Sequence, residues 1–117
     1  LMAVTQKTAE NFGMDQGATF SKNFTVTTDG STAYDISGLT LQAQMRKSYD
    51  SSSVTATFTA SVVTGASGIY KLVLTEPTTQ GISAGRYVYD VELILSDSTI
   101  EKVHYGVVTV HPEVTKI

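Results

Sequence analysis

Residues 54–62 read VTATFTASV, and this alternation of apolar and hydroxyl side chains decides the fold. Successive side chains of a β-strand point to opposite faces, so the stretch has one apolar face and one hydroxyl face. A helix of the same sequence would spread both kinds of side chain around its circumference. The stretch therefore predicts a strand that is buried on one face only.

The same period of two recurs along the chain, and turn residues separate the segments. It predicts further strands at residues 18–27, 39–46, 69–75, 85–95 and 100–110. A helical turn is expected near residues 76–81, where Pro77 suits a first turn and Gly81 can end it. Gly106 breaks the alternation of the last strand, which predicts a bulge there. About seven to eight short strands with turns between them predict an all-β, immunoglobulin-like β-sandwich.

The sandwich is expected to span residues 18–112, between an N-terminal arm and a C-terminal tail. Residues 1–17 show no clear period, so they predict an extended arm with one short strand at most. Residues 113–117 follow Pro112, which ends the last strand. Because Leu1 precedes Met2, we also expect Met2 to begin the natural protein and the chain to be a complete small gene product.

A tyrosine corner is the most specific structural feature that the sequence predicts. Residues 84–89 read AGRYVY. Immunoglobulin-like sandwiches often carry a tyrosine near the start of the sixth strand, and its hydroxyl bonds back to the preceding corner. Tyr87, which follows Gly85, would be that tyrosine, and Tyr89 would fill the core position that holds Cys in antibodies. The alternative is that both are ordinary inward-facing aromatic residues.

Composition limits the classes of partner. The chain has no Cys, which removes disulfides, thiolate metal sites and a cysteine nucleophile. Its net charge is -3, and its eight Lys and Arg residues are scattered, whereas binding to nucleic acid phosphates needs them clustered. No apolar stretch approaches the ~20 residues that span a bilayer. We therefore expect neither nucleic acid, a membrane nor a small-molecule substrate as partner.

No group of residues predicts catalysis. The two histidines, His104 and His111, are seven residues apart, which places them on opposite faces of a regular strand. Asp90 and Glu92 share a face, as a glycosidase pair would, but exposed strand faces often carry such charges. Phosphate-binding loops, serine nucleophile motifs and calcium loops are missing from the sequence. We expect no enzyme activity, no metal and no cofactor.

Two aromatic residues support an alternative function as a carbohydrate-binding or adhesive module. Tyr49 lies in a Ser-rich loop and Tyr105 in the last strand, and neither has a secure core position. Exposed aromatic rings can stack on sugars, so both are candidate glycan contacts. The other interpretation is that the Tyr49 ring folds over the end of the sandwich.

Several segments together resemble a family of small bacteriophage structural domains, the N-terminal domains of baseplate upper proteins and related tail modules. The matching segments are Asp29-Gly30, residues 34–46, Gly68 with its following strand, residues 84–93 and residues 106–115. The resemblance implies a non-enzymatic virion protein of the tail, baseplate or neck, made in the host cytoplasm. It implies partners among copies of this chain and other virion proteins, and no shared catalytic residues. The chain ends before the coiled or receptor-facing region of longer relatives, which favours a connector.

Two segments are candidates for the contacts of such an assembly. The 54–62 strand carries no charge, and charges are a common protection of a strand at a sheet edge. The arm has a few apolar residues that could seat on a neighbouring subunit by strand addition. The alternative is that residues 5–8 form the first strand of the chain's own sandwich. The candidate interface residues are Val4, Phe12, Met14, Val54, Thr55, Thr57 and Thr59.

Overall fold

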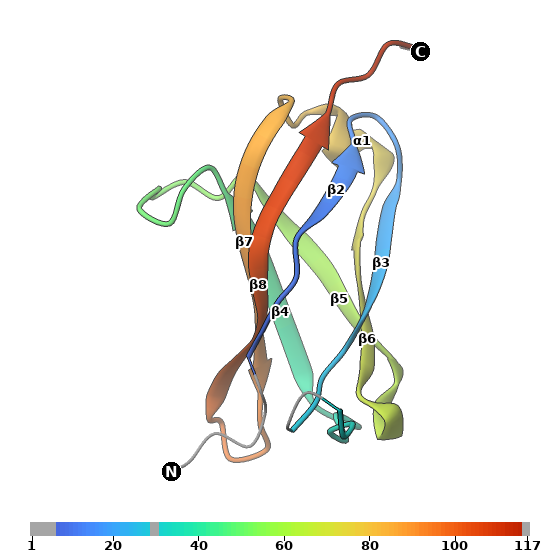
Figure 1. The fold of residues 1–117 in the computed structure, drawn as a ribbon, viewed down its shortest axis with the longest axis vertical. Helices are drawn as coiled ribbons and strands as arrows, with labels where there is room; N and C mark the ends of the chain where they lie inside the picture. Colours follow the sequence, from blue (N-terminus) through green and yellow to red (C-terminus); the bar gives the residue numbers. More distant parts are fainter. Residues whose placement is uncertain (1–6, 29–30, 116–117) are drawn as a thin grey trace.

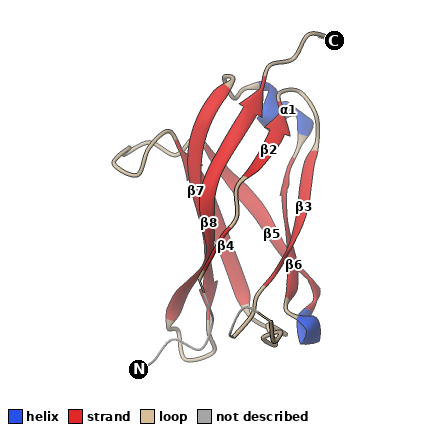
Figure 2. Ribbon diagram, in the orientation of Figure 1, coloured by secondary structure: helices blue, strands red, loops and turns tan. Residues whose placement is uncertain are grey.

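The structure is a computed structural model that describes residues 7–28 and 31–115. These residues form eight strands, one short helix and one 3-10 turn (Figures 1 and 2), so the predicted all-β fold is confirmed. The elements are β1 (Thr8–Ala9), β2 (Phe12–Asp15), β3 (Phe20–Thr25), β4 (Thr40–Arg46), β5 (Ala56–Thr64), η1 (Gly65–Ser67), β6 (Ile69–Leu74), α1 (Glu76–Gln80), β7 (Gly85–Ile94) and β8 (Ile100–His111). Neither helical element of the described residues has the length and apolar character to cross a membrane.

The strands form two sheets that share β5. One sheet runs β8-β7-β4 with antiparallel pairing, and it continues into residues 56–58 of β5. Residues 59–64 of β5 pair instead with β6, which pairs with β3. Figure 1 shows β5 crossing obliquely from one layer to the other. The orders β4-β7-β8 and β5-β6-β3 correspond to the C-F-G and D-E-B strands of an immunoglobulin-like sandwich.

An aromatic cluster fills the space between the sheets. Phe12 lies at its centre, with its ring 4.8 Å from Tyr89 and stacked at 5.1 Å on Phe20. The rings of Phe24 and Phe58 lie 6.0 and 6.3 Å from Phe12, at steep angles to it. Aromatic pairs in such geometries each contribute ~1 kcal/mol beyond the burial of their area. The N-terminal segment therefore belongs to the core.

This position corrects the prediction of an exchanging N-terminal arm. Residues 12–15 form β2, which pairs in parallel with β8, and β1 pairs with β8 further back. Met14 is buried, and Phe12 is held in the aromatic cluster. The prediction failed because the inward side chains of Phe12 and Met14 are enough to hold the segment on its own sandwich when the free edge of β8 supplies its backbone hydrogen-bond partners. The domain begins at β1 and not at residue 18, while Val4 lies outside the described residues.

The predicted bulge at Gly106 is also corrected. The register of β7 against β8 shifts between Val91 and Glu92, so the extra residue is Val103. Val103 and His104 are consequently both buried, although they are adjacent in sequence. Gly106 serves another purpose, because a Cβ atom there would lie 2.6 Å from Asn11 Oδ1 and 2.7 Å from the Glu10 carbonyl oxygen. Only glycine lets residues 10 and 11 of the N-terminal segment approach β8 this closely.

Candidate functional site

The corner before β7 is held by Tyr87. Its hydroxyl donates to the Ser83 carbonyl oxygen at 2.6 Å, inside the corner where the sequence predicts this bond. Gly85, at the start of β7, has φ +147°, a conformation that glycine adopts without strain. The Lys47 ammonium covers the Tyr87 ring, 4.7 Å from its centre. The corner therefore fixes how the chain enters β7, and it has a structural role.

Tyr89 is buried as predicted for its core position, and it has a second role that the sequence did not indicate. Its hydroxyl donates to the Glu10 carbonyl oxygen at 2.5 Å. Burial raises the pKa of the Tyr89 hydroxyl, so it remains a donor at neutral pH. The bond ties the N-terminal segment, which runs along the edge of β8, to the core of the sandwich.

The two histidines lie in different surroundings. His111 is exposed, whereas His104 is buried and its Nδ1 lies 2.7 Å from the Tyr70 hydroxyl. The Phe24 ring packs at 5.0 Å from the imidazole. Burial lowers the pKa of His104 to about 4 and raises that of Tyr70. His104 is therefore neutral at physiological pH and already has its hydrogen-bond partner, so its role is structural.

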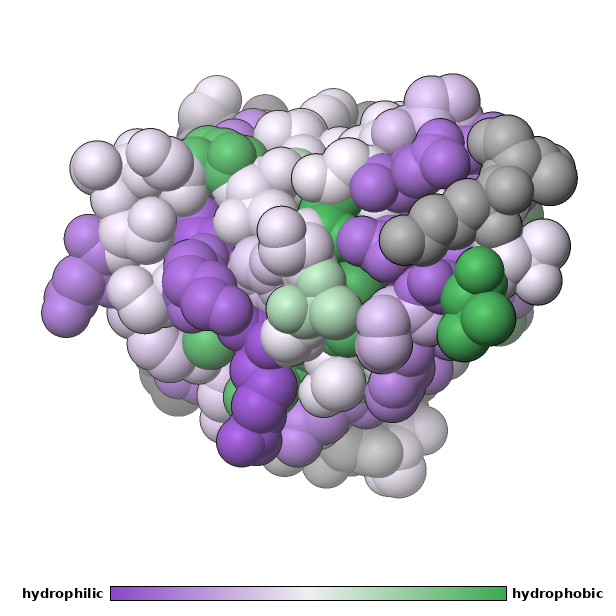
Figure 3. Space-filling model, turned by 90° about the horizontal axis from the view of Figure 1, so that it is seen from above, coloured by the Kyte–Doolittle hydropathy of each residue, from purple (hydrophilic) through white to green (hydrophobic). Residues whose placement is uncertain are grey.

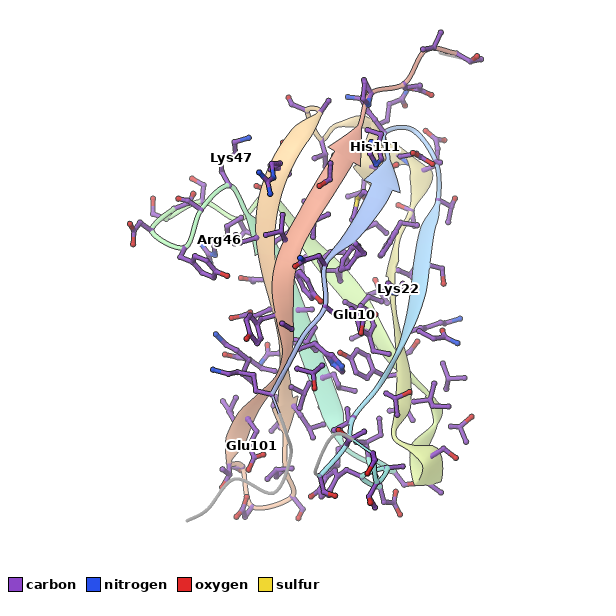
Figure 4. The ribbon with its side chains drawn as sticks, in the orientation of Figure 1. Glu10, Lys22, Arg46, Lys47, Glu101 and His111 are labelled. Atoms are coloured by element: carbon purple, nitrogen blue, oxygen red, sulfur yellow. The ribbon has the colours of Figure 1, made fainter. Side chains whose placement is uncertain are left out.

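An ion pair lies at the seam between β2 and β3, which no backbone ladder closes in the described residues. The Lys22 ammonium lies 2.9 Å from a Glu10 carboxylate oxygen, and Figure 4 shows the two side chains pointing toward one another. Both are about one-third exposed, so the pair contributes little net stability. Side-chain contacts, above all Phe12 on Phe20, hold the seam together.

Residues 59–64 of β5 form a feature that we call the β5 strip. Their ladder partner is β6, and within the described chain no strand pairs with their other edge. All six except Ala60 are exposed, including Val62 (38%) and Val63 (48%). The sequence has no charged residue from Ser51 to Tyr70. The strip is thus a strand edge without charge protection, although a bulge between Val62 and Thr64 interrupts its far end.

Of the four residues near β5 that the sequence predicts as interface contacts, the structure places only Thr59 on the β5 strip. Thr59 lies on the strip, but Thr57 pairs with Gln44 of β4 and is no edge residue. Val54 and Thr55 precede the strand, where Val54 is exposed and Thr55 half-buried. Next to the strip, the outer face of β6 and β3 has a single charge among the outward residues Ser21, Asn23, Thr25, Lys71 and Val73.

A polar groove lies on the outer face of the other sheet. Its larger part has a volume of about 290 Å³ and is lined by residues of β4 and β7: Gln42, Ala43, Gln44, Arg46, Asp90 and Glu92. A smaller part of about 140 Å³ extends to Tyr49, which is 69% exposed. Tyr105 does not line the groove, and its ring is covered by the Lys7 ammonium at 5.3 Å. Of the two predicted glycan contacts, the structure places only Tyr49 there.

Other groups of chemical interest do not form a site. In the part of the chain that the structure describes, no three side chains of His, Asp or Glu gather as a metal site would need. Asp90 and Glu92 do share the outer face, where the Lys102 ammonium lies 3.3 Å from Asp90. The end of the molecule seen in Figure 3 is mostly polar or neutral, with its apolar residues scattered.

Removing the corner hydroxyl should destabilise the domain. We expect Tyr87→Phe to lower the free energy of unfolding by about 1 kcal/mol, because the Ser83 carbonyl loses its donor. Urea unfolding measures the change, and Tyr49→Phe is the matched control, since the exposed Tyr49 hydroxyl has no bond to lose. An unchanged unfolding midpoint for Tyr87→Phe would show that the Tyr87–Ser83 hydrogen bond does not stabilise the fold.

The buried imidazole should make stability depend on pH. The pKa of His104 is about 4 in the folded state and about 6.5 in the unfolded state, so the unfolded chain binds more protons between these values. The free energy of unfolding should therefore fall as the pH drops from 6.5 toward 4, by up to about 3 kcal/mol.

The variant His104→Leu isolates this contribution in urea unfolding at a series of pH values. It should be less stable at pH 7, because the Tyr70 hydroxyl loses its partner, and its slope between pH 6.5 and 5 should be much shallower. If the free energy of unfolding fell equally steeply with pH for His104→Leu and the wild-type protein, His104 would not be the source of the pH dependence.

Comparison with known proteins adds little to this picture. No protein-family model matches the chain, and no curated protein sequence matches it. Among solved structures, it is similar to an internalin-like protein of Listeria monocytogenes, with a TM-score of 0.48 and 11% identity. The similarity covers 90% of this chain and 28% of that protein. A similarity of this degree indicates nothing about function.

Proposed function

We propose that this chain is a non-enzymatic structural domain of a bacteriophage virion, which joins a tail, baseplate or neck assembly. It acts by self-association and by docking to other virion proteins. The proposal is supported by the resemblance of residues 18–115 to small phage structural domains. Its place of action would be the virion, after synthesis in the host cytoplasm.

The single observation that carries the proposal is the β5 strip. An unpaired strand edge offers a row of N–H and C=O groups to another chain, and proteins that remain monomeric usually protect such edges with charges. Here the exposed residues are Thr, Ser and Val, and the neighbouring outer face adds only Lys71. A second copy can therefore approach the strip without like-charge repulsion.

The interior supports a structural role over a catalytic one. The hydroxyl groups of three core tyrosines are used inside the fold: Tyr70 bonds His104, Tyr87 bonds Ser83 and Tyr89 bonds Glu10. No buried side-chain polar atom of the described residues lacks a partner. The interior therefore holds no polar side chain that is unpaired and ready to react.

A lysine in the β5 strip should prevent self-association. We expect Thr59→Lys to raise the dimer dissociation constant at least tenfold, because an inserted charge blocks strand pairing at an edge. Thr40→Lys is the matched control, since Thr40 is equally exposed but lies on β4 in the other sheet. Sedimentation velocity over a range of concentrations measures both.

Two results would overturn the proposal. One is that the wild-type chain remains monomeric up to millimolar concentration, or that Thr59→Lys self-associates as strongly as the wild-type chain does. The other is the absence of the chain from a mass-spectrometric inventory of purified particles. The two variants should keep the wild-type free energy of unfolding, because both substitutions are exposed.

A further inference from the structure

The groove on β4 and β7 lies on the face of the sheet and offers mainly side chains. β7 pairs with β4 and β8, and β4 pairs with β7 along its length and with β5 at residues 43–45, so the middle of the groove has strands on both sides. An extended peptide would need free backbone groups to add as a strand. The groove therefore suits a ligand that binds through side-chain hydrogen bonds and ring contacts.

Two cross-strand pairs form the floor of the groove. Gln42 lies opposite Glu92, and Gln44 lies opposite Asp90, two residues further along. Each pair presents an amide, which donates and accepts, beside a carboxylate, which only accepts. The side chains of Gln42 and Glu92 make no hydrogen bond or ion pair with the described residues, so their hydrogen-bonding capacity is unused. A ligand with adjacent hydroxyl groups can donate to the carboxylate and accept from the amide.

Charge in the groove balances. The carboxylates of Asp90 and Glu92 and the guanidinium of Arg46 line the groove, and the Lys102 ammonium, which is outside the lining, lies 3.3 Å from Asp90. With Lys102 included, two positive side chains match the two negative ones. The groove therefore favours a neutral polar ligand over a cation or a phosphate.

Arg46 holds the end of the groove at which Tyr49 lies. One guanidinium nitrogen donates to the Ser51 carbonyl oxygen at 3.1 Å, and the other to Gln44 Oε1 at 3.1 Å. The first bond fixes the loop of residues 47–53, which carries Tyr49. Figure 4 shows this loop projecting from the sheet beside the labelled Arg46. Tyr49 is the most exposed aromatic residue of the described chain and lines the same groove. An exposed ring next to polar groups suits the apolar face of a sugar ring.

We propose that this groove is a carbohydrate-binding site for a neutral oligosaccharide. A sugar ring stacks on Tyr49, and the hydroxyl groups of the glycan bind Arg46, the two glutamines and Glu92. This activity goes beyond the proposed structural role, and it uses the sheet that the β5 strip leaves free. An assembled particle would then present the groove to glycans at its surface.

The test is an array of immobilised neutral oligosaccharides that also carries sialylated glycans. We expect the full chain to bind at least one neutral oligosaccharide and to prefer neutral over sialylated glycans. Tyr49→Ala and Glu92→Ala should each weaken that binding at least tenfold. Tyr105→Ala is the control, because Tyr105 is outside the groove and covered by Lys7, and it should leave binding unchanged.

The outcomes separate this proposal from the structural one. Thr59→Lys should keep glycan binding while losing self-association, since residue 59 lies on the other sheet. Failure of the wild-type chain to bind any neutral oligosaccharide, or wild-type binding by Tyr49→Ala or Glu92→Ala, would overturn the glycan site. A matching unfolding midpoint for each variant excludes loss of fold as the cause.

Discussion

The pairing of the N-terminal segment with the free edge of β8 is the constraint on which the rest of the structure depends. Gly106 removes the side chain that would block Glu10 and Asn11, and the Asn11 side chain accepts from the Val107 amide at 2.9 Å. This close approach packs the half-buried Phe12 against the core, beside the rings of Phe20 and Tyr89. Without it, the rings of Phe20 and Tyr89 would face an unfilled space between the sheets.

This constraint also determines which surfaces remain for function. Because β2 occupies the free edge of β8, that edge is not available to a partner, whereas the outer edge of the β5 strip pairs with no described strand. The two outer faces then differ in chemistry. The β5-β6-β3 face is almost uncharged, whereas the β4-β7 face carries balanced charges and the exposed Tyr49. One face suits contact between proteins and the other suits a polar ligand.

Sequence reasoning succeeded where the signal was local. Alternation located strands β3 to β8, and the corner motif indicated the environment of Tyr87. It failed where the answer depended on partners distant in sequence. Four residues of β2 are too short to show a period, and the bulge at Val103 depends on the register of β7. The Tyr70–His104 bond joins residues 34 apart, and the groove exists only because β4 and β7 are in register.

Amide hydrogen exchange of the monomer tests the seating of the N-terminal segment most directly. The Glu10 amide donates to the Tyr105 carbonyl at 2.8 Å, and the Gln16 amide donates to that of His111 at 2.9 Å, so these two bonds bracket β2. The account predicts that both amides exchange as slowly as those of β7 and β8, because the segment is released only when the sandwich unfolds. Exchange at the rate of an unstructured peptide, while β7 and β8 stay protected, would contradict it.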